Sequence, residues 1–185
     1  MRQSLSFLWE VIKIFILALV IVLPIRFFLF QAFVVKGASM EPSYHGGDYL
    51  IVDEISYRFH NPQRGDVIVF HYPFNPQARF IKRVIGLPGE IVKIEKGQVK
   101  IYNDKFPQGK ILDESSYLGK NSFTSKDLEI VLGSSQYFVM GDNREFSFDS
   151  REWGPLERKY IIGKVRVRLF SFERLPHLRL LFGQK

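Results

Sequence analysis

Two residues, Ser39 and Lys82, lie in settings that could activate them for chemistry. Ser39 is part of Gly37-Ala38-Ser39-Met40-Glu41-Pro42, and Lys82 has apolar neighbours on both sides. A serine hydroxyl becomes a nucleophile when a base takes its proton. A lysine that points into an apolar interior has a lowered pKa and can be that base. Two other interpretations remain open: Ser39 as an ordinary turn residue, and Lys82 on the solvent face of its strand.

The other residue types that usually do chemistry offer no competing site. The four histidines are scattered through polar stretches without the spacing of a metal site: His45, His60, His71 and His177. The chain has no cysteine, which excludes disulfides, thiolate metal sites and a cysteine nucleophile, and leaves the cellular compartment undecided. There is also no glycine-rich phosphate loop. We therefore expect neither a metal nor a cofactor.

Three stretches together resemble the bacterial type I signal peptidases, which are membrane-anchored Ser/Lys proteases. The first carries Ser39-Met40 with Pro42, and the second is Arg79 to Glu90, with Ile81-Lys82-Arg83 and Gly86-Leu87-Pro88-Gly89. The third is Gly141-Asp142-Asn143-Arg144-Glu145-Phe146-Ser147-Phe148-Asp149-Ser150-Arg151. Gly65 to Phe70 also matches a structural strand of that family. The resemblance covers the chain from the apolar N-terminal segment to about Gly163.

The resemblance implies a role for each matching residue. Ser39 would be the nucleophile and Lys82 the general base, so that the chain would be a serine endopeptidase. Ser147 would orient the lysine amine through a hydrogen bond. Asp149 and Arg151 would form an ion pair that supports the site, together with Asp142 as a further supporting residue.

The same resemblance implies the substrate, which would be the signal-peptide-bearing preprotein of a secreted protein. Signal peptides end in a small-x-small pattern at the cleavage site. Phe33, Val35 and Ile81 are close in sequence to Ser39 and Lys82, so we expect them to line shallow pockets for small side chains.

Two positions depart from the commonest family pattern. Ser43 stands where threonine is commoner, which keeps a hydroxyl at this position. Gly37 stands where some members have a serine whose hydroxyl helps to stabilise the oxyanion. The oxyanion hole would then depend on the Ser39 backbone N–H and a second donor that the sequence does not identify. Gly37 could alternatively be required for its backbone conformation.

The elements that must position these residues are mainly strands with period-two hydrophobicity bounded by turn residues. They are Tyr49–Val52, Asp66–Phe70, a hairpin over Glu90–Tyr102 around Lys96-Gly97, Gln136–Met140 and Lys164–Leu169. The last alternates strictly, which predicts one buried face and one basic face. Residues 103–135 are polar and read as a small insertion with little core of its own. We expect a mainly β, antiparallel domain, which the resemblance makes barrel-like, with one N-terminal transmembrane helix.

The most apolar segment, Phe7–Val35, is predicted to hold a single transmembrane helix at about Leu8–Phe28. Glu10 and Lys13 within it can pair on one helix face. A cleaved signal peptide is the competing interpretation. The flanking positive charges do not decide the orientation. The resemblance implies a cytoplasmic tip and anchor at residues 1–30 and an extracytoplasmic catalytic domain at 31–185, in the bacterial cytoplasmic membrane and close to the secretion translocase.

Of the formal net charge of +7, residues 151–185 contribute most, with nine Lys or Arg against three Asp or Glu. Apolar residues interleave with these charges from Leu169 onward, which is typical of a segment that lies on anionic lipid. Packing of the same residues on the β domain remains the alternative. We expect membrane lipid and preproteins as partners, and no nucleic acid. The classes that compete are a self-cleaving repressor, against which the apolar N-terminus argues, and a non-enzymatic anchored β domain.

Overall fold

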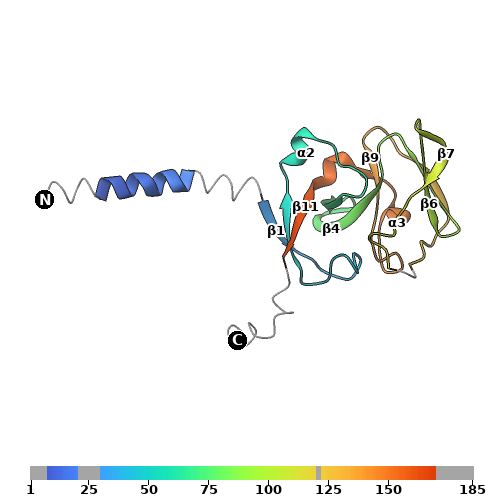
Figure 1. Ribbon diagram of the computed structural model, residues 1–185, viewed down its shortest axis with the longest axis horizontal. Coiled ribbons are helices and arrows are strands. Elements are labelled where there is room, and N and C mark those ends of the chain that lie inside the picture. The colour runs from blue at the N-terminus through green and yellow to red at the C-terminus, as the bar shows by residue number, and fades with distance from the viewer. Residues whose placement is uncertain (1–7, 21–29, 120–121, 170–185) are drawn as a thin grey trace, which may run out of the picture.

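The computed structural model describes residues 8–20, 30–119 and 122–169 (Figure 1). Residues 8–20 are helical. The described strands are β1 (Phe30–Val34), β2 (Tyr49–Asp53), β3 (Val67–Tyr72), β4 (Asn75–Gly86), β5 (Ile91–Glu95), β6 (Gln98–Asn103), β7 (Phe106–Ile111), β8 (Leu128–Val131), β9 (Gln136–Met140), β10 (Leu156–Glu157) and β11 (Ile161–Leu169). Short helical turns complete the description: α2 (Ser56–Phe59), α3 (Ser150–Trp153) and the 3-10 turn η1 (Arg158–Tyr160).

The strands form two antiparallel sheets. The larger has the order β1-β2-β11-β3-β4-β9-β10 and the smaller the order β7-β6-β5-β8. Figure 1 shows β1 and β11 at one end of this arrangement and β6 and β7 at the other. The prediction of a mainly β, antiparallel domain is confirmed. The barrel-like closure is not: over the described residues the larger sheet ends at β1 on one side and at β10 on the other, without pairing between them.

The strands with clear alternation lie where the sequence predicts them, as β2, β3, β5, β6, β9 and β11. The turn between β5 and β6 uses Lys96 and Gly97, both at positive φ, as a tight hairpin requires. In β11 the expected alternation stops after Val165, because the register shifts between Val165 and Val167. Val167 and Leu169 are consequently exposed, while basic side chains of this strand pair with carboxylates of its neighbours.

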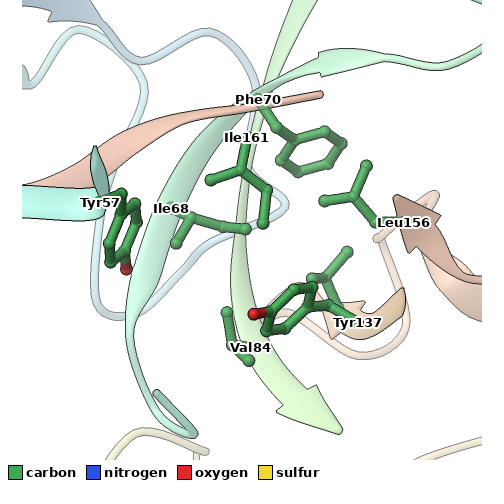
Figure 2. Close-up of a cluster of buried hydrophobic side chains, with 8 residues drawn as sticks. Tyr57, Ile68, Phe70, Val84, Tyr137, Leu156 and Ile161 are labelled. Atoms are coloured by element: carbon green, nitrogen blue, oxygen red, sulfur yellow. The ribbon is translucent and has the colours of Figure 1, made fainter. Parts of the chain in front are cut away.

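The two sheets are held together by buried apolar side chains that cluster on and near β4. In one cluster, side chains from β3, β4, β9 and β11 meet with Tyr57 and Leu156 (Figure 2). A second cluster packs the smaller sheet against the end of β4 and against β9, through residues such as Ile85 and Phe138. β4 has 12 residues, pairs with β3 along most of its length and reaches β9 only from Arg83 onward. It therefore contributes to both cores, through Val84 and Ile85, which follow directly after the stretch that holds Lys82.

The polar stretch 103–135 is more ordered than its composition suggests. β7 pairs with β6 and β8 pairs with β5, so this stretch supplies both edge strands of the smaller sheet. Between these strands, Glu114 and Thr124 are buried. Composition alone could not indicate this, because the groups that bury these polar side chains lie elsewhere in the chain.

At the N-terminus, the helix over residues 8–20 carries the predicted pair, with Lys13 Nζ 2.6 Å from Glu10 Oε1. Within the described ranges, no helix is both long and apolar enough to cross a membrane. Residues 21–28 of the predicted span Leu8–Phe28 lie outside the described residues, as does the chain after Leu169, which is the predicted lipid-contacting tail.

Candidate active site

The structure brings Ser39 and Lys82 together from positions 43 residues apart. Lys82 Nζ lies 2.7 Å from Ser39 Oγ and donates a further hydrogen bond of 3.0 Å to the carbonyl oxygen of Ile81. A contact of this length allows direct proton transfer between hydroxyl and amine. The two side chains have the geometry of a nucleophile and its base.

Lys82 occupies a buried position on β4. Its side chain is 4% exposed, and its strand neighbour in β3 is the fully buried Ile68. Burial lowers the pKa of the Lys82 amine to about 8, against the opposing effect of the carboxylates of Asp149 and Asp142. A measurable fraction of the amine is therefore neutral near pH 7, as a general base requires.

The segment that carries Ser39 is held by its backbone. Gly37 has φ +83 and no atom within 4 Å of the position a Cβ would take, so the conformation rather than space favours glycine here. Met40 follows the serine and is buried in the core with Val35. Asn143 donates from its backbone N–H to the Ser39 carbonyl and from its side-chain amide to the Ala38 carbonyl, each at 3.1 Å. These bonds fix the position of Ser39 relative to the loop that follows β9.

The loop after β9 lies directly against the nucleophile. A Cβ added to Gly141 would lie 2.3 Å from the Ser39 carbonyl oxygen and 2.2 Å from Ser147 Oγ. Any side chain at position 141 would displace one of these groups. The sequence Gly141-Asp142-Asn143 therefore needs glycine at its first position for close approach.

Asp149 and Arg151 form a buried ion pair behind this loop, with Arg151 Nε 2.9 Å from Asp149 Oδ1. Asp149 also accepts a hydrogen bond of 3.0 Å from the Gly141 N–H. Burial alone would raise the pKa of the Asp149 carboxyl, but the hydrogen bonds and charge of Arg151 hold it below its usual value. Arg151 in turn donates to the carbonyl of Arg144, so the pair holds both ends of the loop.

Asp142 pairs with Arg83, the residue after the lysine. Arg83 donates from Nε and Nη2 to the two carboxylate oxygens at 2.8 and 2.6 Å. This bidentate contact ties the loop after β9 to β4 next to Lys82. The Arg83 guanidinium also lies 4.2 Å from the ring centroid of Tyr117.

Ser147 lies beside the dyad, but its geometry differs from the sequence-based expectation. Its Oγ is buried and has no well-aligned hydrogen bond among the described residues, including none to Lys82 Nζ. It is close enough to Asp149 to contribute to the lowered pKa of that carboxyl. Its proximity to Gly141 and the Ser39 carbonyl nevertheless places this hydroxyl at the site.

A cleft of about 860 Å³ opens at the dyad. On one side it is lined by residues 32–39, which lead to Ser39, and on the other by residues 77–82 of β4, which lead to Lys82. Phe33, Val35 and Ile81, expected to form pockets, all line it. Residues 32–34 belong to β1 and residues 77–82 to β4, so both walls are extended backbone, which suits an extended peptide next to the nucleophile.

One supporting contact was not foreseen from the sequence. Arg144 is 2% exposed and donates to both carboxylate oxygens of Glu114, at 3.0 and 2.5 Å, and to Thr124. Tyr117, stacked on Arg83, donates to the same carboxylate at 2.8 Å. Glu114 and Thr124 thereby hold Arg144 and the loop after β9. The matching stretches gave Arg144 as part of a motif, but no local pattern indicates its partners 20 and 30 residues earlier.

Comparison with known proteins shows similarity to one family over most of the chain. The family described as signal peptidase, peptidase S26, matches residues 8–170. A probable signal peptidase I-1 of Synechocystis is 40% identical over 180 residues, covering 94% of this chain and 88% of that protein. A signal peptidase I of Leptolyngbya laminosa is 39% identical over 178 residues, covering 92% and 84%. A crystal structure of a signal peptidase I from Enterococcus faecalis shows 31% identity and a TM-score of 0.47, covering 58% of this chain and 98% of that one.

Proposed function

Because the chain belongs to the peptidase S26 family of signal peptidases, we propose that Ser39 is its nucleophile and Lys82 its general base. Family membership makes the chain a serine endopeptidase that removes signal peptides from preproteins. The assignment of the two residues rests on one observation, the 2.7 Å contact between a buried Lys82 amine and the Ser39 hydroxyl. No histidine lies among the residues that line the cleft.

The reaction proceeds in two steps. In the first, neutral Lys82 takes the Ser39 proton as Oγ attacks the scissile carbonyl, and the resulting ammonium gives that proton to the departing amine of the mature protein. In the second, Lys82 takes a proton from water, which attacks the acyl-enzyme, and the ammonium returns the proton to Ser39 as the signal peptide leaves. Lys82 is thus neutral at the start of each step.

The negative oxygen of the tetrahedral intermediate is stabilised by the Ser39 backbone N–H. In the described part of the chain this N–H donates no hydrogen bond, so it is available to a substrate. Gly37 has no side chain to add a second donor. Its left-handed conformation supports the alternative reason for a glycine at this position, which is the shape of the turn that presents Ser39.

Ser147 assists Lys82 as a positioning residue in this proposal. Replacing Ser147 with alanine should lower kcat by about 10- to 1000-fold, because the base is misaligned but not removed. Steady-state cleavage of a preprotein substrate, with KM and thermal stability measured alongside, tests this. Unchanged kinetics in a stably folded Ser147→Ala protein would show that the hydroxyl plays no part in the reaction.

Cleavage of preproteins that differ at the −1 residue tests the function itself, through the pockets expected at Phe33, Val35 and Ile81. A preprotein with alanine at −1 and −3 should be cleaved after the −1 residue by the detergent-solubilised full chain. Replacing the −1 alanine with phenylalanine should block cleavage, because we expect the pockets lined by Phe33, Val35 and Ile81 to accept only small side chains. Mass spectrometry of the products locates the cut. Equal processing of the alanine and phenylalanine substrates would place selectivity outside these residues.

The setting of the reaction follows from the same proposal. Residues 1–30 serve as a cytoplasmic tip and single transmembrane anchor, and residues 31–185 act on the outer face of the bacterial cytoplasmic membrane. Ser39 is only nine residues after Phe30, where β1 begins, so the dyad stays near the end of the anchor. Membrane lipid and the secretion translocase are then the neighbours of the domain, and preproteins are its substrates.

A further inference from the structure

The charges that line the cleft are all of one sign. Among the described residues, its charged lining consists of Lys36, Arg79 and Lys82, with no carboxylate. Lys82 serves the reaction and is buried. Lys36 and Arg79 are exposed and have no place in the mechanism above. A peptide that enters the cleft therefore meets a positive field at a fixed place.

Arg79 is the better placed of the two to recognise a substrate side chain. It lies on β4 three residues before Lys82, and its guanidinium carbon is 5.3 Å from the centroid of the Phe33 ring across the cleft. Stacking of this kind holds an arginine in one orientation and leaves its N–H donors free. No ion pair or hydrogen bond of the Arg79 side chain is found in the described part of the chain.

The other arginine of β4 and the arginines of β11 are already paired with carboxylates. Arg83 pairs with Asp142, Arg166 with Asp53 and Arg168 with Asp48. Arg79 differs from them because it borders the cleft and no carboxylate of the described chain pairs with it. The N–H donors of its guanidinium are therefore free to bind an acidic side chain of a substrate.

The position of Arg79 along β4 indicates which substrate residue it meets. On the side of β4 opposite β3, pairing with β9 begins only at Arg83, and no described strand pairs with residues 75–82 on that side. An extended chain advances about 3.3 Å per residue, so Arg79 lies about 10 Å along β4 from Lys82, level with the third or fourth residue of a peptide bound alongside the strand. Because signal peptides are recognised by small residues at −3 and −1, the acyl side of the substrate must occupy this cleft. The −3 residue is small, which leaves −4 as the position for a charged side chain.

We propose that Arg79, held against Phe33, is a specificity residue that favours substrates with an acidic side chain at −4 and disfavours a basic one. This inference rests on the proposed function, since it assumes that the cleft beside Ser39 holds the signal peptide. The ligand is a carboxylate at the rim of the cleft, paired with a guanidinium that is partly shielded by an aromatic ring.

The test uses three preproteins that differ only at −4, with Asp, Asn or Lys, and the full chain in neutral detergent without anionic lipid. For the wild type we expect kcat/KM to fall in the order Asp, Asn, Lys, with about a 10-fold difference between Asp and Lys that shrinks as salt is added. Arg79→Glu should reverse the order, and Arg79→Gln should nearly abolish it. Arg58→Glu makes the same charge change at an exposed arginine of α2 outside the cleft, and should keep the wild-type order.

The outcomes distinguish a failure of the role of Arg79 from a failure of the proposed function. An unchanged Asp-to-Lys ratio in Arg79→Glu, with the Asn substrate still cleaved through Ser39, overturns the role of Arg79 and leaves the proposed function intact. Loss of the ratio in Arg58→Glu as well would show a general field of the domain and also overturn it. Failure of the wild type to cleave the Asn substrate would contradict the proposed function itself.

Discussion

Replacing Ser39 with alanine, or Lys82 with alanine or arginine, should each abolish preprotein processing. We expect a loss of about 10³-fold or more in kcat, because neither the nucleophile nor its base has a substitute in the cleft. Arginine keeps the charge and length of the side chain but does not lose its proton in a protein, so it cannot serve as the base. Cleavage of a preprotein by purified variants measures the effect.

The controls for these variants are folding and additivity. Each variant should keep the cooperative unfolding of the wild type. The double variant Ser39→Ala, Lys82→Ala should be scarcely slower than either single one, because the pair acts as a unit. Lys93→Arg changes a partly exposed lysine of β5, away from the cleft, and should leave the rate unchanged. Substantial activity in Lys82→Arg would contradict the assignment of Lys82 as general base.

Removal of Glu114 should produce the largest loss of stability among the variants considered. Glu114→Ala leaves Arg144 as an uncompensated charge that is 2% exposed. Breaking a buried pair from one side typically lowers the free energy of unfolding by about 3–5 kcal/mol. That is a large share of the roughly 5–15 kcal/mol that stabilises a domain. Urea unfolding followed by fluorescence measures the change.

Glu129→Ala is the matched control. Glu129 lies on β8, an edge strand of the smaller sheet, where it is exposed and its carboxylate is 3.7 Å from Lys93 Nζ. It should cost less than about 1 kcal/mol. The milder variant Glu114→Gln keeps the shape of the side chain and should fall between the two. Equal destabilisation by Glu114→Ala and Glu129→Ala would contradict the claim that Glu114 holds Arg144 and the loop after β9.

The parts of the fold that the sequence predicts are those set by local alternation. β2, β3, β9 and the hairpin of β5 and β6 each carry a period-two pattern bounded by turn residues, and each is present. β7 and β8 were missed because their side chains are mostly polar or exposed, so that pairing with β5 and β6 defines them and not a buried face. The bulge in β11 was likewise invisible, since strict alternation hides a register shift.

At the site, the sequence indicates which residues take part, and the structure gives the distances between them. Apolar neighbours on both sides of Lys82 indicate its burial. The 2.7 Å contact with Ser39 depends on the sheet, in which β2, β11 and β3 lie between β1, the strand before Ser39, and β4, the strand of Lys82. The bonds of Asn143 to the carbonyls of Ala38 and Ser39 were not foreseen, because they join segments more than 100 residues apart. Contacts of this kind leave no periodic signal.

The pH dependence of kcat/KM for wild-type cleavage tests the Ser39–Lys82 mechanism most directly. Burial lowers the pKa of the Lys82 amine to about 8, and only the neutral amine can accept the serine proton. The rate constant should therefore rise about tenfold per pH unit below pH 8 and level off above it, with about a tenth of the maximum at pH 7. A profile that is half-maximal near pH 6.5, where histidines titrate, or one that is flat between pH 6 and 9, would contradict a lysine base.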